Sequence, residues 1–128
     1  MTVTANPRAA YLANIVNQAS PLKRLIMLMD RLSLDIERGG RAANAKDREE
    51  SKRQFSHAQE IVQELQSTLR SDVWDGAKDL RDLYHYLYMR LAVAGINSDL
   101  RAARDALVVA KGLTATWRRV AVALGEDI

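Results

Sequence analysis

The stretch Ala77–Ile96, AKDLRDLYHYLYMRLAVAGI, decides the fold because its apolar residues follow the period of a helix on two sides. One stripe, spaced three and four residues apart, consists of Leu80, Leu83, Tyr84, Leu87, Leu91 and Ala94. A second stripe with the same spacing consists of Tyr86, Met89, Val93 and Ile96. At about 100° per residue, the two stripes lie roughly opposite each other. A helix in a small bundle has one inward side, so the second stripe predicts contact with another segment of this chain or with a different protein.

The composition favours helices and excludes several kinds of site. The chain has 128 residues, enough for one domain with a core that needs no disulfide or metal. It has no cysteine, which excludes disulfides, thiolate metal sites and thiol catalysis. No apolar run approaches the roughly 20 residues of a membrane span. Residues 1–16 lack the basic-then-apolar layout of a signal peptide, so a cytoplasmic protein is expected.

The charge is too small and too evenly spread to indicate a nucleic-acid-binding protein. The formal net charge is +3. Residues 1–70 hold 11 Lys/Arg against 8 Asp/Glu, and residues 71–128 hold 8 against 8. Specific DNA-binding domains concentrate more positive charge than this in one stripe. A basic regulator that binds nucleic acid therefore stays only as an alternative.

Four helices are expected after a polar leader of residues 1–19, at about residues 20–45, 47–70, 75–96 and 98–124. Ser20 followed by Pro21 is typical of a helix start. Asp47-Arg48-Glu49-Glu50 resembles a capping box, and Asn97-Ser98-Asp99 caps the last helix. The first helix has two possible ends. Gly39-Gly40 could stop it, but Ala43 keeps the heptad spacing and favours an end near Ala45.

The inner stripes of the other helices complete the predicted core. In chain order they are Leu22, Leu25, Ile26, Met29, Leu32 and Ile36; then Phe55, Ala58, Ile61, Val62, Leu65 and Leu69; then Leu100, Ala103, Leu107, Ala110, Thr114, Trp117, Ala121 and Leu124. Four long helices, short links and no strand signal predict an all-α, antiparallel up-down four-helix bundle with an N-terminal cap segment, in a single domain of residues 1–128. On the far side of the first helix, Met27 and Leu34 lie beside the column Arg24, Arg31 and Arg38, which is interpreted as a solvated face.

Residues that could support catalysis are missing from the sequence. His57 and His85 are the only histidines, and neither has a partner at ligand spacing on its own helix. Both are interpreted as surface or boundary residues. There is no Gly-rich phosphate loop, no Walker lysine and no nucleophile elbow. The chain is therefore not expected to be an enzyme, and no cofactor or metal is expected.

Six short motifs occur in order between residues 6 and 119. They read NPRAAY (6–11), ASP (19–21), MLMD (27–30), AQEIVQEL (58–65), LYHYL with a following RL (83–91), and TWR (116–118). Together they resemble the FliS family of flagellar secretion chaperones. The chain departs from the family pattern at Gln18, Arg24, Met29, His85 and Gly95.

The resemblance implies a cytoplasmic chaperone that holds unassembled flagellin by its C-terminal segment, with no nucleotide or metal. It also implies that the leader covers part of this surface and is displaced. A segment that orders on binding needs a long surface with apolar anchors, and methionines adapt to several packings. The residues expected to contact flagellin are Tyr11, Val16, Met27, Leu34, Tyr86, Met89, Val93 and Ile96.

Other occupants of the second stripe remain open. The chain's own leader or a second copy could cover it, so the protein is expected to be a monomer or a weak dimer. Components of the export gate are further candidate partners. Two other function classes predict different behaviour. A nucleic-acid regulator should bind with a steep salt dependence, and a self-associating structural bundle should form a dimer that is unaffected by added flagellin.

Tyr84 is expected in the core, with its hydroxyl reaching a polar partner.

Overall fold

The computed structural model describes residues 7–8, 20–69 and 76–126, and long α-helices make up most of this part of the chain. They are α2 (Pro21–Asn44), α3 (Arg48–Thr68), α4 (Ala77–Asn97) and α5 (Leu100–Ala123). No strand occurs within the described residues. The all-α prediction is confirmed.

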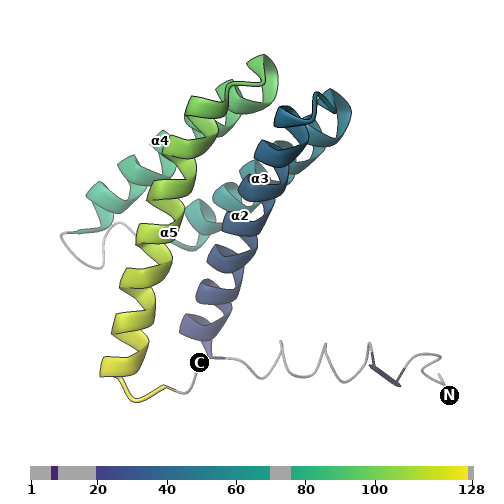
Figure 1. Ribbon diagram of the computed structural model, residues 1–128. Helices are drawn as coiled ribbons and strands as arrows, with labels where there is room; N and C mark the ends of the chain where they lie inside the picture. The colour runs from purple at the N-terminus through teal and green to yellow at the C-terminus, as the bar shows by residue number, and fades with distance from the viewer. Residues whose placement is uncertain (1–6, 9–19, 70–75, 127–128) are drawn as a thin grey trace, which may run out of the picture.

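The four helices pack in a ring in their chain order. Helix α2 contacts α3 and α5, and α4 contacts the same two helices, so α2 and α4 lie on a diagonal. Figure 1 shows the α2–α3 and α4–α5 turns at one end of the bundle. The start of α2 and the end of α5 lie at the other end. The antiparallel arrangement predicted from the short links is therefore confirmed.

Helix α2 begins where the sequence predicted and has the later of its two possible ends. The Ser20 side chain caps the helix by accepting a hydrogen bond from the Lys23 N–H at 3.1 Å. Pro21 occupies the first turn, where its missing N–H costs nothing. The helix continues through Gly39-Gly40 to Asn44, and Lys46 then turns the chain with a left-handed φ of 61°.

Gly39 lies inside α2 because a ring of the next helix occupies the space of a side chain. A Cβ atom built at this position would lie 2.8 Å from Cζ of Phe55 on α3. Gly40, its neighbour, faces open space, with nothing within 4 Å of the corresponding Cβ. The first glycine therefore serves close helix packing, whereas packing does not explain the second.

Helix α3 begins with half of the predicted capping box. The Asp47 side chain accepts a hydrogen bond from the Glu50 N–H at 3.2 Å, as expected. The second bond of a capping box, from the Asp47 N–H to the Glu50 side chain, does not form. The Asp47 N–H donates to the carbonyl of Ala42 instead. The Glu50 carboxylate forms an ion pair with Arg53 and accepts a hydrogen bond from Gln54. The turn between α2 and α3 is tight enough for the backbone of the previous helix to take that donor.

Helices α4 and α5 are joined by the predicted cap. Ser98 has a left-handed φ of 51°, and the Asp99 side chain accepts hydrogen bonds from the N–H groups of Arg101 and Ala102. This geometry satisfies donors at the start of α5 that have no partner within the helix.

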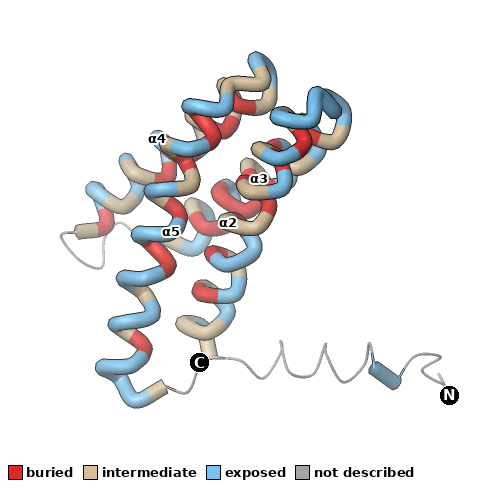
Figure 2. Tube along the Cα trace, in the orientation of Figure 1, coloured by how far each residue is buried: buried red, intermediate tan, exposed pale blue. Residues whose placement is uncertain are grey.

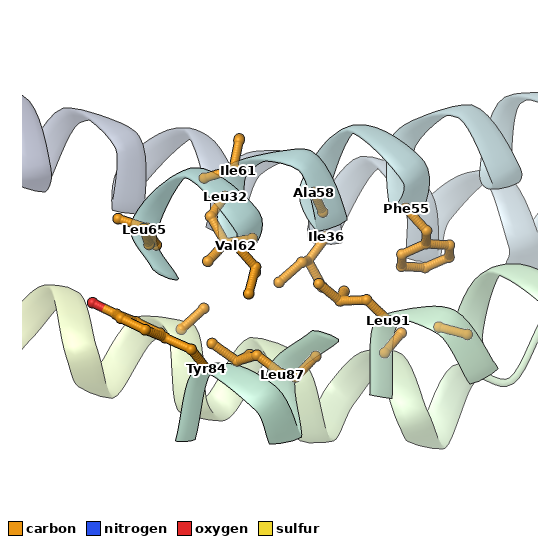
Figure 3. Packing of buried hydrophobic residues seen from close by; sticks show 14 of the residues in the cluster. Leu32, Ile36, Phe55, Ala58, Ile61, Val62, Leu65, Tyr84, Leu87 and Leu91 are labelled. Atoms are coloured by element: carbon orange, nitrogen blue, oxygen red, sulfur yellow. The ribbon is translucent and has the colours of Figure 1, made fainter. Parts of the chain in front are cut away.

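The core lies between the four helices, and Figure 3 shows its side chains meeting from opposite sides. The inner stripe of α4 is confirmed, with Tyr84, Leu87, Leu91 and Ala94 at most 2% exposed. The inner stripe of α5 is partly wrong. Three residues of α5 that were not assigned to this stripe are buried: Ala102, Ala106 and Leu113.

Two leucines assigned to the inner stripe of α5 are exposed instead. Leu100 is 37% exposed and Leu124 is 69% exposed. Leu100 is the first residue of α5 and Leu124 follows its last residue, so both lie where neighbouring helices give little cover. Alanines make up most of the buried side of α5, which allows its backbone to approach its neighbours closely.

Helices α2 and α5 are also joined by polar contacts along their length. Asp30 pairs with Arg118, and Glu37 pairs with Lys111 at 3.1 Å between Oε1 and Nζ. At the end of the bundle, the Ser20 hydroxyl donates a 2.8 Å hydrogen bond to the Glu126 carboxylate. The first and last of these helices are thus linked by side chains at several levels.

Candidate partner-binding site

The outward side of α4 carries a row of exposed apolar residues. Tyr86 is 43% exposed, Met89 49% and Ile96 71%. Figure 2 shows the corresponding pattern along the tube, where buried and exposed positions interchange on every helix. Soluble proteins expose single apolar residues commonly, but several at helical spacing on one face indicate a contact surface.

Val93 belongs to this row by spacing but is more buried than its neighbours. It is of intermediate exposure and packs against the core cluster. Three residues of the predicted row are therefore exposed, and the fourth, Val93, lies at the boundary between the surface and the core. We call Tyr86, Met89, Val93 and Ile96 the α4 row.

The two candidate residues on α2 lie apart from the α4 row. Met27 is 41% exposed and Leu34 is of intermediate exposure. Because α2 and α4 are diagonal in the ring, outward residues on one do not join those on the other. Met27 instead lines a groove of about 610 Å³ between the start of α2 and the end of α3, with Leu22, Leu25 and Leu28 among its other walls.

Tyr11 and Val16, the two candidate residues of the leader, lie outside the described residues. Their contribution to the site stays a prediction.

Tyr84 lies in the core, as predicted. It is 2% exposed and packs among the buried residues labelled in Figure 3. Burial away from water raises the pKa of the Tyr84 hydroxyl to about 12, because the phenolate is poorly solvated there. This tyrosine therefore supports the fold and offers nothing to a partner.

A buried acid on α2 joins two basic groups, a contact that was not predicted from the sequence. Asp35 is fully buried. Its Oδ1 accepts a 3.0 Å hydrogen bond from Nε of Arg31, and its Oδ2 contacts Nδ1 of His57 on α3. Buried carboxylates need such partners. His57 is indeed a boundary residue, but it has an acidic partner 22 residues away that spacing along one helix could not reveal.

The described residues hold no group of three or more His, Cys, Asp or Glu side chains placed to bind a metal ion. None of the helices described is both long and apolar enough to cross a membrane. The surface features that remain are apolar rows and grooves between helices, which suit binding of a polypeptide.

A second groove, also missed from the sequence, lies between α2 and α5. It has a volume of about 510 Å³. Its lining comes from the last turns of α2 and the first turns of α5 and consists of Ile36, Glu37, Gly40, Arg41, Asn44, Leu100, Ala103, Arg104 and Leu107. The signal in the sequence was the heptad spacing of charged residues on these two helices, which needs the helix register to interpret.

Comparison with known proteins identifies the family of this chain. The family described as "Flagellar protein FliS" matches residues 4–124. The chain belongs to the FliS family. A relative is the flagellar secretion chaperone FliS of Bacillus subtilis (strain 168), which is 33% identical over 94 residues, 73% of this chain and 70% of the relative. FliS proteins are chaperones, so membership agrees with the expectation that the chain is not an enzyme.

Proposed function

We propose that this FliS protein is a cytoplasmic export chaperone that holds the C-terminal segment of unassembled flagellin against the α4 row. Binding would mask the end of the subunit that takes part in assembly, and would so prevent premature polymerisation before secretion. The observation that carries this proposal is the exposure of Tyr86, Met89 and Ile96 along one side of a helix whose other side is fully packed.

The dimensions of the α4 row suit a helical segment. Tyr86 and Ile96 are ten positions apart, which spans about 15 Å along a helix. An amphipathic helix binds such a surface through apolar residues three, four and seven positions apart. Met89 in the middle of the row is flexible enough to follow a ligand whose packing varies along its length.

A client that is disordered when free explains why more than one surface would be used. Ordering such a segment costs free energy, so a tight complex needs contacts along a long path. The groove beside Met27 supplies a second apolar surface, reached by passing around α3. Leu34, half-buried two turns further along α2, extends that surface. The leader, through Tyr11 and Val16, would compete with the client for part of this path.

The decisive test is a charge placed in the α4 row. Met89→Glu and Ile96→Glu should each weaken binding of a peptide of the last ~40 flagellin residues at least about tenfold, since burying a carboxylate among apolar side chains is unfavourable. Val122→Glu introduces the same charge at a position that is 71% exposed near the end of α5, at the opposite end of that helix from the α4–α5 turn, and should leave affinity unchanged. Titration calorimetry measures affinity. Circular dichroism checks that every variant melts like the parent.

Three results would contradict the proposal. The first is equal affinity for the parent, Met89→Glu and Ile96→Glu. The second is loss of the fold in both row variants, which would show that the row is part of the core. The third is conversion of a dimer into a monomer with flagellin binding intact, measured by sedimentation. Val93→Glu is a poorer probe, because Val93 also contacts the core.

Removal of the leader tests its role as a competing cover. Deletion of residues 1–18 keeps Ser20, which caps α2. Affinity for the flagellin peptide should stay equal or rise, because a competitor for the surface has been removed. A marked fall would mean that Tyr11 and Val16 hold the client directly.

A further inference from the structure

Helices α2 and α5 carry charged residues in matching heptads. On α2, Asp30, Glu37 and Asn44 are seven residues apart; on α5, Arg118, Lys111 and Arg104 follow in the opposite direction. The first two levels form ion pairs, Asp30 with Arg118 and Glu37 with Lys111. Antiparallel helices in constant register then place Asn44 opposite Arg104. We call this series the α2–α5 charge ladder.

The third level of the ladder has a cation and no acid. Asn44 has no charge, and within the described residues Arg104 makes no ion pair. Arg41, one turn before Asn44, is also exposed and without an ion pair in that part of the chain. Two guanidinium groups, which match a carboxylate in geometry, therefore remain available at this level.

The incomplete level opens directly onto the second groove. Arg41, Asn44 and Arg104 line its rim, and apolar atoms of Ile36 and Leu107 lie among its walls. Gly40 also lines the groove, and a Cβ there would meet nothing within 4 Å. From Ile36 to Asn44 the groove follows about 12 Å of helix, the length of two helical turns.

The two helices that form the groove carry a net positive charge. Helix α2 holds five Lys/Arg against three Asp/Glu, and α5 holds five against one, so the two carry a net charge of +6. Helix α3 holds three Lys/Arg against four Asp/Glu and α4 three against two, so that pair has no net charge. Helices α2 and α5 lie in different halves of the sequence. Charge counted over residues 1–70 and 71–128 therefore does not reveal this difference between the two pairs of helices.

The geometry points to a second docking site in the α2–α5 groove, for an acidic segment of another protein that also carries apolar side chains. A carboxylate of that segment pairs with Arg104 and completes the third level of the ladder. An apolar side chain three or four residues away enters between Ile36 and Leu107. The net positive charge of α2 and α5 attracts the acidic segment.

A protein segment fits this groove better than nucleic acid does. Phosphate backbones offer no apolar group for the walls that Ile36 and Leu107 supply. No residue of the α4 row lines this groove, which lies between α2 and α5. Occupation of the groove is therefore independent of the client proposed for the row.

The test uses the full chain and a labelled helical peptide of about 16 residues, long enough to populate a helix. Leucines are placed three and four apart on one side, with glutamates beside them. Fluorescence anisotropy should show that this peptide binds at least ten times more tightly than the same peptide with Glu replaced by Gln, or with Leu replaced by Ser. A single-stranded oligonucleotide serves as the polyanion without apolar side chains.

Variants of the chain separate the ladder from general charge. Arg104→Glu should reduce peptide affinity at least tenfold. Lys52→Glu makes the same charge change at an exposed residue of α3 and should change the affinity less than twofold. Asn44→Glu supplies the missing acid within the protein and should reduce affinity at least fivefold, whereas Asn44→Gln should not. Gly40→Leu fills the groove and should abolish binding while the melting temperature is kept or raised.

Each contrary outcome removes the proposal. Equal losses in Arg104→Glu and Lys52→Glu would mean general electrostatic attraction. Tighter binding of the oligonucleotide would assign the face to nucleic acid. A dimer that dissociates in Gly40→Leu would assign it to a second copy, and displacement of the peptide by the flagellin segment would assign it to the client. Binding of no peptide more tightly than about 1 mM would show that the groove is not a site.

Discussion

The two sides of helix α4 contain similar residues with opposite roles. Tyr84 and Leu87 face inward and are at most 2% exposed, whereas Tyr86 and Met89, two positions further along in each case, are 43% and 49% exposed. Residue type therefore does not separate core from exposed positions in this protein. Position around the helix does, and the same contrast recurs on α2.

The largest expected difference lies between Leu87 and Met89. Leu87→Ala should lower the free energy of unfolding by about 3 kcal/mol, because it leaves a cavity among fully buried neighbours. Met89→Ala should change it by less than about 0.5 kcal/mol. Urea unfolding followed by circular dichroism measures both. A similar loss of unfolding free energy in the two variants would show that Met89 is packed as tightly as Leu87.

Two acids on α2 give the next comparison. Asp35 is buried between Arg31 and His57, whereas Asp30 is about half exposed and pairs with Arg118. Asp35→Ala should cost about 2–3 kcal/mol, since it removes charge-assisted hydrogen bonds from the interior. Asp30→Ala should cost less than about 1 kcal/mol, as surface ion pairs do. A larger loss for Asp30 in the same unfolding assay would contradict the assignment.

High pH distinguishes the buried tyrosine. The folded state raises the pKa of Tyr84 from 10.0 to about 12, so the unfolded chain releases this proton first as pH rises. Stability from this group is complete below pH 10 and falls between pH 10 and 12, by about 2–3 kcal/mol in all.

Denaturant titrations from pH 9 to 12 measure this loss. Tyr84→Phe should flatten the decline relative to the parent, and Tyr86→Phe on the outer side should not. The same slope in all three proteins would show that Tyr84 ionises freely in the folded state.

The smallest expected changes in stability are those of alanine substitutions at the two adjacent glycines, Gly39 and Gly40. Gly39→Ala should destabilise by about 1–3 kcal/mol, because its methyl group would overlap the ring of Phe55. Gly40→Ala should stabilise by about 0.5–1 kcal/mol, since alanine favours the helix and nothing obstructs it. Thermal melting of both variants measures the signs, and a shared sign would mean that the α2–α3 contact is looser than the structure shows.

The helices and most of the core could be predicted from the sequence because they depend on local periodicity and capping. The buried side of α5 was harder to predict, since alanines give a weak apolar signal and the leucines Leu100 and Leu124 lie at the ends of the helix.

Features that join two helices could not be found by spacing along one. Asp35 contacts His57 across the α2–α3 interface. Asn44 and Arg104 line the same groove, which the sequence could not show without the register of α2 against α5. The α4 row was predictable as a stripe, but its occupant was not, because an apolar surface does not specify what covers it. The resemblance to FliS proteins supplied that part of the proposal.

The pairing of α2 with α5 also bears on how the chain folds during synthesis. All other strong helix contacts join elements that are consecutive in sequence, so they can form while the ribosome is still adding residues. The α2–α5 contact, with the Ser20–Glu126 hydrogen bond at its end, closes a loop of roughly the whole bundle and pays the largest chain-closure entropy. A nascent chain truncated before α5 should therefore expose one flank of its core to chaperones and proteases, and gain protection from them only when the last helix leaves the exit tunnel.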